Sequence, residues 1–173
     1  PGHIESLTSK LEEAGVKLDI GKNYVRVPYV GEYKAIDVKT VVYPGFPTDL
    51  QPQMGVTLAT AEGTSIINES IWESRFQYTN ELNKMGAQIT AQGKSAIFEG
   101  VEKLTGASVY STDLRAGAAL IIAGIAAEGI TGEVAQLMKV YAYSHAYNAY
   151  SIIRKTKKMA ATTIPFRRSE LLP

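Results

Sequence analysis

Two short stretches place an aspartate directly after a threonine, where the chain turns toward an expected helix. The first is "PGFPTDLQPQ" at 44–53, which carries Asp49, and the second is "STDLRAG" at 111–117, which carries Asp113. A carboxylate presented at such a turn can accept a proton from a substrate hydroxyl. It can instead complement the dipole at the start of the helix, which is an architectural role. These residues alone leave both interpretations open for both aspartates.

Two arginines stand close to such motifs. Arg75 lies in "SIWESRF" at 70–76, and Arg115 follows Asp113 by two residues. The planar guanidinium group of Arg75 can pair bidentately with a carboxylate or a phosphate. A salt bridge at the surface is the architectural alternative for Arg75.

The elements that would position these residues follow a pattern that occurs twice. The stretch "HIESLTSKLEEAG" at 3–15 has apolar residues at helical spacing, and "VKLDIGKNYVRV" at 16–27 alternates on either side of a turn at 21–23. They predict an amphipathic helix followed by a β-hairpin. The later stretch "YTNELNKMGAQITAQGKSAIFEG" at 78–100 predicts the same order, with a helix that ends at Gly86.

The repetition continues beyond the hairpins. Each hairpin leads to a further predicted strand, "AIDVKTVVY" at 35–43 or "GASVYS" at 106–111, then to Thr-Asp-Leu, and then to a helix that closes with Ala-Glu-Gly. The two Thr-Asp-Leu motifs are 64 residues apart and the two Ala-Glu-Gly motifs are 66 apart. Self-similarity of this kind predicts a repeated supersecondary unit of about 65 residues.

Local chemistry predicts how the two later helices begin and pack. Thr48 and Thr112 are good N-caps, and Pro52 fits within a first helical turn because its missing N–H costs little there. The helix expected in "DLRAGAALIIAGIAAEG" at 113–129 is apolar nearly all round, so we expect it to be buried on several sides.

Composition bounds the class of protein. The chain has 173 residues, of which 45% are hydrophobic and 20% charged, as expected for one soluble domain with a sizeable core. It has no cysteine, which excludes disulfides, thiolate metal sites and a cysteine nucleophile on this chain. The apolar run 116–127 is shorter than the roughly 20 residues of a membrane-spanning helix. The first ten residues lack a secretory-signal pattern, so we expect a cytoplasmic protein.

Charge is distributed unevenly along the chain. Residues 1–138 carry 11 basic and 16 acidic side chains, a balance of −5, whereas residues 139–173 carry 7 and 1, a balance of +6. A basic end can bind nucleic acid or acidic lipid, which would suit a non-catalytic binding domain. A solvated end is the commoner explanation of such a segment, so nucleic acid is not the partner we favour.

The motifs "PGFPTDLQPQ", "AEGTSIINESIWESRF" and "STDLRAGAALIIAGIAAEGIT", with "ELNKMGA" between them, occur in one order over about residues 3–131. In these motifs the chain resembles the enolpyruvyl transferases. The resemblance implies an α/β lobe, an inside-out barrel of repeated βαβαββ-type units with helices inside and small sheets outside. We therefore predict a partial lobe with two units at 1–132 and a non-matching basic, Tyr-rich segment at 133–173.

The resemblance also implies a reaction, and the wording "PTDLQ" and "ESRF" favours the branch that acts on UDP-N-acetylglucosamine. That branch transfers the enolpyruvyl group of phosphoenolpyruvate to the sugar 3-hydroxyl for peptidoglycan synthesis, by addition and elimination through a tetrahedral intermediate. Neither a metal ion nor a cofactor is implied. A sister enzyme, 5-enolpyruvylshikimate 3-phosphate synthase, is the alternative within the family.

Roles for individual residues follow from the matched motifs. Asp49 matches the aspartate that contacts the sugar hydroxyl and accepts its proton, and Thr48 is expected to cap the helix and aim Asp49. Ile71 matches an apolar position that lines the nucleotide-sugar pocket. Arg75 matches the arginine that faces the phosphoenolpyruvate end of the site.

Asp113 and Arg115 match a second motif near the cleft between two lobes, where an architectural role and a catalytic role are equally compatible. The chain lacks the family's other lobe, with its phosphoenolpyruvate-binding lysine and arginine and its mobile loop. The likeness ends near Gly132, before the family's next unit and its arginine-bearing turn. We therefore expect a fragment without activity on its own.

Overall fold

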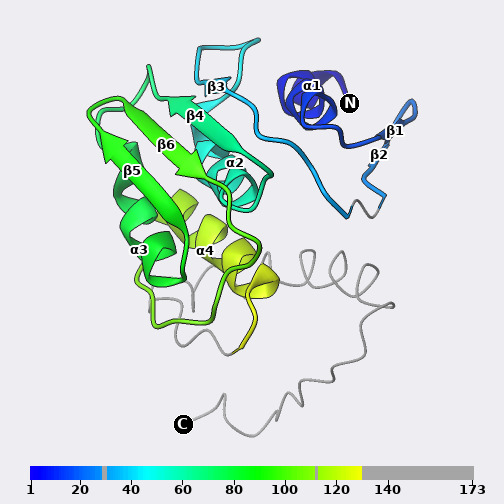
Figure 1. Cartoon of the computed structure of the whole chain (residues 1–173). Coiled ribbons are helices and arrows are strands. Elements are labelled where there is room, and N and C mark those ends of the chain that lie inside the picture. Colours follow the sequence, from blue (N-terminus) through cyan, green and yellow to red (C-terminus); the bar gives the residue numbers. More distant parts are fainter. Residues whose placement is uncertain (29–30, 112, 130–173) are drawn as a thin grey trace, which may run out of the picture. The chain divides into compact units, whose positions relative to one another are not determined.

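The computed structural model describes residues 1–28, 31–111 and 113–129 of the chain (Figure 1). The two local periodicities of the sequence, helical and alternating, become short helices and strands. Three single 3-10 turns, at Gly2–Ile4, Thr48–Leu50 and Arg75–Gln77, precede helices. The helices and strands, in chain order, are α1 (Glu5–Glu13), β1 (Asp19–Ile20), β2 (Val25–Arg26), β3 (Val38–Lys39), α2 (Gln51–Leu58), β4 (Thr64–Asn68), α3 (Tyr78–Lys84), β5 (Gln88–Gln92), β6 (Ser95–Glu99) and α4 (Leu114–Ala126).

A four-stranded sheet with the order β3-β4-β6-β5 organises the described residues. Strand β3 runs parallel to β4, and the other two pairings are antiparallel. Alternation along β4 turns Ser65 and Ile67 inward and leaves Ile66 partly exposed, as expected for a sheet with one covered face. Helices α2, α3 and α4 lie together on one side of this sheet (Figure 1).

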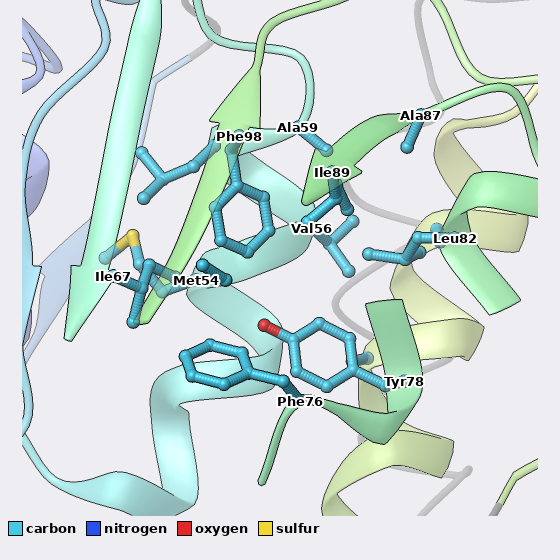
Figure 2. Packing of buried hydrophobic residues seen from close by; sticks show 14 of the residues in the cluster. Met54, Val56, Ala59, Ile67, Phe76, Tyr78, Leu82, Ala87, Ile89 and Phe98 are labelled. Carbon is cyan, nitrogen blue, oxygen red and sulfur yellow. The ribbon is translucent and has the colours of Figure 1, made fainter. Parts of the chain in front are cut away.

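The hydrophobic core lies between the sheet and the helices. Figure 2 shows Phe98 and Ile67 from the sheet meeting Met54 of α2 and Tyr78 of α3. Fully burying one such large side chain contributes about 1.5–3 kcal/mol, so these contacts tie the elements together. The turns that precede α2, α3 and α4 are thereby held at fixed places beside one another.

Matched backbone hydrogen bonds accompany the repeat in the sequence. Equivalent bonds, with the N–H donor first, are Lys34–Ala14 (2.9 Å) and Thr105–Met85 (2.8 Å), Ala35–Glu62 (2.9 Å) and Gly106–Glu128 (2.8 Å), and Glu62–Tyr33 and Glu128–Leu104 (both 2.9 Å). Each Ala-Glu-Gly ends on a glycine with positive φ, +108° at Gly63 and +95° at Gly129, a conformation that favours glycine. The two stretches thus use the same local chemistry to return from a helix.

Both predicted hairpins are confirmed. Strands β1 and β2 pair antiparallel about the turn at 21–23, and β5 and β6 pair antiparallel about Gly93. The strand predicted at 35–43 is reduced to β3, with one isolated bridge at Thr40.

The strand predicted at 106–111 is wrong, because this stretch has irregular structure. Val109 is fully buried, but the N–H of Tyr110 donates to the carboxylate of Glu81 at 2.9 Å rather than to a neighbouring strand. The alternating pattern is typical of a strand, but here its buried residue, Val109, anchors a loop to the core.

Helix α4 is buried on one face. Ala116, Ala119 and Leu120 are buried, and the helix contacts α2 and α3. Leu114 and Ile125 are 53% and 43% exposed. We expected this helix to be buried on several sides, but only the side that faces α2 and α3 is buried.

Two predictions from the sequence need separate mention. No helix in the described ranges is long and apolar enough to cross a membrane. The basic stretch 139–173 and the capping role expected of Thr112 fall outside the described residues.

Candidate active site

One cleft of about 450 Å³ collects side chains from three segments that are distant in the sequence. Its walls contain all six residues that the sequence nominated, together with Trp72, Ser74 and Gln77. The lining residues are Thr48, Asp49, Ile71, Trp72, Ser74, Arg75, Gln77, Asp113 and Arg115.

The cleft forms where two helices begin side by side. Asp49 lies in the 3-10 turn that leads into α2, after Pro47 in an extended conformation. Asp113 is the residue before the first turn of α4, and α2 and α4 pack against each other. The two Thr-Asp-Leu motifs are thereby brought together, and Arg75 enters from the 3-10 turn before α3.

Asp49 and Arg115 form a bidentate ion pair. The Nε of Arg115 donates to Oδ1 of Asp49 at 2.9 Å, and Nη2 donates to Oδ2 at 3.0 Å. Arg75 lies further away, with its Nη2 3.6 Å from Asp49 Oδ1 and its Nη1 3.9 Å from Asp113 Oδ1. The side chain of Arg75 is only 9% exposed, whereas that of Asp49 is 54% exposed and open to the cleft.

These contacts set the charge of Asp49. The hydrogen bonds from Arg115 lower the pKa of Asp49, the charges of Arg115 and Arg75 lower it further, and slight burial acts in the opposite direction. The same pairing raises the pKa of Arg115. Asp49 is therefore an ionised carboxylate at neutral pH, able to accept a proton once it is released from the guanidinium group.

Asp113 fulfils the architectural role that the sequence left open. Its Oδ1 accepts hydrogen bonds from the backbone N–H of Arg115 at 2.8 Å and of Ala116 at 3.1 Å, which caps α4. Asp49 makes no such capping bond, because no side chain caps its turn or α2. Identical Thr-Asp-Leu motifs thus place one carboxylate on local amides and the other on an arginine.

The capping role predicted for Thr48 is wrong. Its hydroxyl donates to Oε2 of Glu69 at 2.9 Å and accepts from Nε of Arg75 at 3.3 Å. The buried carboxylate competes for the hydroxyl and turns it away from the start of the helix. Thr48 therefore connects Glu69 to Arg75.

Sequence reasoning did not single out Glu69, which is 1% exposed. A signal was present: alternation along β4 sends Ser65 and Ile67 inward, so position 69 has the same parity. A charged residue at an inward position needs hydrogen-bond partners, and three of them, Thr48, Ile71 and Trp72, belong to the cleft wall.

Trp72 is 58% exposed and lines the cleft. The Cζ of Arg75 lies 5.4 Å from the centroid of its ring, within the range of a cation–π contact. Ile71 lies beside it and is 43% exposed toward the cleft.

The cleft contains side chains that can bind an organic anion and a carboxylate that can accept a proton. No group of three His, Cys, Asp or Glu side chains that could hold a metal ion occurs in the part of the chain that the structure describes. Two guanidinium groups can bind a carboxylate or a phosphate, and Asp49 can accept a proton beside them.

A model of the family EPSP synthase (3-phosphoshikimate 1-carboxyvinyltransferase) matches residues 1–151. The match extends beyond residue 132, where we expected the likeness to end. It includes every element that lines the cleft.

Relatives with curated names are similar over most of the chain. UDP-N-acetylglucosamine 1-carboxyvinyltransferase 3 of Caldanaerobacter subterraneus subsp. tengcongensis is 47% identical over 167 residues, which are 96% of this chain and 39% of the relative. UDP-N-acetylglucosamine 1-carboxyvinyltransferase of Desulfofundulus thermocisternus is 53% identical over 131 residues, 76% of this chain and 54% of the relative. The chain spans 39% and 54% of the lengths of these two relatives.

Solved structures show the same mixed helix-and-sheet fold. The enolpyruvyl transferase NikO from Streptomyces tendae aligns with a TM-score of 0.63 and 28% identity, covering 69% of this chain and 28% of NikO. EPSP synthase from Acinetobacter baumannii aligns with a TM-score of 0.51 and 16% identity, covering 76% of this chain and 33% of that one. The second likeness concerns the fold alone.

Proposed function

The chain belongs to the EPSP synthase family, and on this premise we propose that it forms part of one lobe of an enolpyruvyl transferase acting on UDP-N-acetylglucosamine. The observation that supports this proposal most directly is the cleft, in which an ionised Asp49 faces solvent between two guanidinium groups. High identity to relatives named for this reaction supports the choice of sugar nucleotide. The proposed setting is peptidoglycan precursor synthesis in the cytoplasm.

The proposed chemistry adds a sugar hydroxyl to phosphoenolpyruvate. The 3-hydroxyl oxygen bonds to the carbon that bears the phosphate while its proton passes to Asp49, and the methylene carbon gains a proton from an acid. The tetrahedral intermediate then loses phosphate and a proton from its methyl group, which restores the double bond. General-base assistance of this kind is worth about 10²–10⁴-fold in rate.

Asp49 becomes a stronger base when Arg115 changes its partner. The hydrogen bonds from Arg115, at 2.9 and 3.0 Å, stabilise the ionised form of Asp49 and lower its pKa, so the paired carboxylate accepts a proton less readily. In the proposed cycle an anionic substrate attracts Arg115, and Asp49 turns to the hydroxyl. Arg75 stays with the carboxylate or phosphate, since its buried side chain has less freedom to move.

The finer architecture is part of the same proposal. We assign residues 1–132 to two units of an inside-out barrel, with α2 and α4 among its inner helices. The exposed apolar side of α4, with Leu114 and Ile125, suits a helix that meets further apolar surface in a complete lobe. The second lobe would close the cleft over the sugar nucleotide and complete the phosphoenolpyruvate site.

Shikimate 3-phosphate is the alternative acceptor, because the family model is named for the enzyme that uses it. A two-lobed chimera, in which residues 1–129 replace the matching segment of the Caldanaerobacter relative, separates the two. We expect phosphate release with UDP-N-acetylglucosamine and none with shikimate 3-phosphate. The reverse preference would identify the sister enzyme, and no release with either acceptor would count against the proposed function.

Asp49→Asn in this chimera tests the assigned base. We expect the turnover number to fall by about 10²–10⁴-fold, the range for loss of a general base. Asp19→Asn is the matched control, because Asp19 lies in the β1–β2 hairpin and lines no part of the cleft. A chimera that keeps near-normal turnover with Asp49→Asn would contradict the role of Asp49.

A further inference from the structure

Arg75 is held in the cleft mainly by contacts other than its ion pairs. Its two carboxylate contacts are long, at 3.6 Å to Asp49 and 3.9 Å to Asp113. The remaining contacts are the hydrogen bond from its Nε to the Thr48 hydroxyl and the ring of Trp72 beneath its Cζ. These two neighbours therefore define where the guanidinium group lies.

Both neighbours are bound to the same buried side chain. Oε2 of Glu69 accepts the hydroxyl of Thr48 at 2.9 Å, and Oε1 accepts the backbone N–H of Trp72 at 3.0 Å. Oε1 also accepts the N–H of Ile71 at 2.8 Å and the hydroxyl of Thr40 at 2.7 Å. One carboxylate thus joins the end of β3, the turn before α2 and the loop that carries the cleft wall.

We propose that Glu69 is a positioning residue for Arg75, acting through Thr48 on one side of the guanidinium group and Trp72 on the other. The positioning is a property of this chain, whereas its consequence for substrate binding rests on the proposed function. Glu69 itself does not line the cleft.

A carboxylate suits this place better than an amide. All four partners donate to Glu69, and an ionised carboxylate accepts on both oxygens. A glutamine amide accepts on one oxygen only, so its NH₂ group would face either Thr48 or the other three donors. The negative charge also favours a buried guanidinium group one hydroxyl away, and it helps to raise the pKa of the neighbouring Tyr78, for which burial is the larger cause.

The fluorescence of Trp72 tests the proposal on the 173-residue chain, because this is its single tryptophan. Arg75→Gln removes the cation that covers the indole ring, so acrylamide should reach the ring more easily. We expect the acrylamide quenching constant to rise by about twofold, a factor in keeping with the loss of a weak cation–π contact. Glu69→Gln should raise the constant by a similar factor. In the double variant the two effects should not add, since both remove the same contact.

Glu73→Gln is the matched control, because Glu73 is exposed in the same loop and lines no part of the cleft. It should leave the quenching constant unchanged. If Arg75→Gln keeps its full effect in the Glu69→Gln protein, Arg75 is still over the ring without Glu69, and the proposal is overturned. An unchanged constant in folded Glu69→Gln would overturn it equally.

Thr48→Val covers the case in which circular dichroism shows that Glu69→Gln does not fold. This variant removes the hydroxyl that links Glu69 to Arg75 and keeps the shape of the side chain. A raised quenching constant that no longer responds to Arg75→Gln supports the proposal, and an undiminished response refutes it. None of these results depends on turnover, so they stand apart from the test of the proposed function.

Discussion

Asp49 and Asp113 show how one tripeptide produces two different electrostatic sites. Asp113 accepts two backbone N–H groups, whereas Asp49 pairs with an arginine 66 residues away along the chain. The difference comes from the second motif, whose Arg115 reaches across to the first one. The first motif has Gln51 in the equivalent place and cannot return the contact.

Arg115→Gln should therefore raise the pKa of Asp49 toward the ordinary value of an aspartate. The arginine supplies the hydrogen bonds that are the largest cause of the lowered pKa, and Arg75 alone lies too far away to replace them. A ¹³C NMR titration of the side-chain carboxylates would measure the shift. A carboxyl group whose pKa is lower in the folded than in the unfolded protein stabilises the fold at pH values above its unfolded-state pKa. This stabilisation is lost as the pH falls through the folded-state pKa, so the variant, which lacks it, should lose less stability on acidification.

Lys103→Gln is the control for this titration. It removes one positive charge from an exposed pair with Glu128, which lines no part of the cleft. The pKa of Asp49 should not change in that variant. Equal pKa values of Asp49 in the wild-type and Arg115→Gln proteins would show that the ion pair does not govern its charge.

The residue types of the cleft could be predicted from the sequence, but their pairings could not. Motif resemblance nominated Asp49, Arg75 and Arg115, and the structure brings them into one cleft. The partner of each depends on how α2 and α4 cross, which no local pattern contains. Thr48 is an example: it was predicted to cap the helix, but its hydroxyl donates to the buried Glu69 instead.

At the scale of elements, small residues allow the helices to approach one another. Gly55 of α2 faces Tyr78 of α3, and a Cβ added at Gly55 would collide with the Tyr78 hydroxyl. Figure 2 places Tyr78 in the middle of the core, with Phe76 beside it. This contact holds together α2 and α3, and the 3-10 turns that precede these two helices contribute residues to the cleft.

Gly55→Ala should destabilise the fold although alanine is the better helix former. Overpacking costs about 1–3 kcal/mol, which outweighs the roughly 0.8–1 kcal/mol gained in helix propensity. Urea unfolding would measure the free energy of unfolding. Tyr78→Phe in the same background should recover part of the loss, because ring atoms would still lie 3.0 and 3.1 Å from the new carbon. A more stable Gly55→Ala protein would mean that α2 and α3 move apart freely.

Local periodicity predicted some elements well and others poorly. Both hairpins are confirmed because a strand, a turn and a returning strand are all encoded within a dozen residues. The strand expected at 106–111 needed a partner from elsewhere in the chain, and Tyr110 binds Glu81 instead. Long-range pairing therefore decides where an alternating pattern becomes a strand.

At the scale of the whole molecule, the balance of charge in the cleft limits what this chain can bind. The lining side chains include two carboxylates and two guanidinium groups, so their formal charges cancel. Phosphoenolpyruvate brings a phosphate and a carboxylate, which need a surplus of positive charge. Under the proposed function, that surplus must come from parts of the enzyme that the described residues do not supply.

The 173-residue chain alone should therefore release no detectable phosphate from phosphoenolpyruvate and UDP-N-acetylglucosamine. The formal charges of the two arginines are balanced by those of Asp49 and Asp113 within the cleft, and the aligned region is only 39% of the Caldanaerobacter relative. A phosphate-release assay with that full-length relative, run in parallel, confirms that the conditions support turnover. Substantial release by the short chain, abolished by Asp49→Asn, would show that one cleft with balanced charge suffices and that the second lobe is not required for the chemistry.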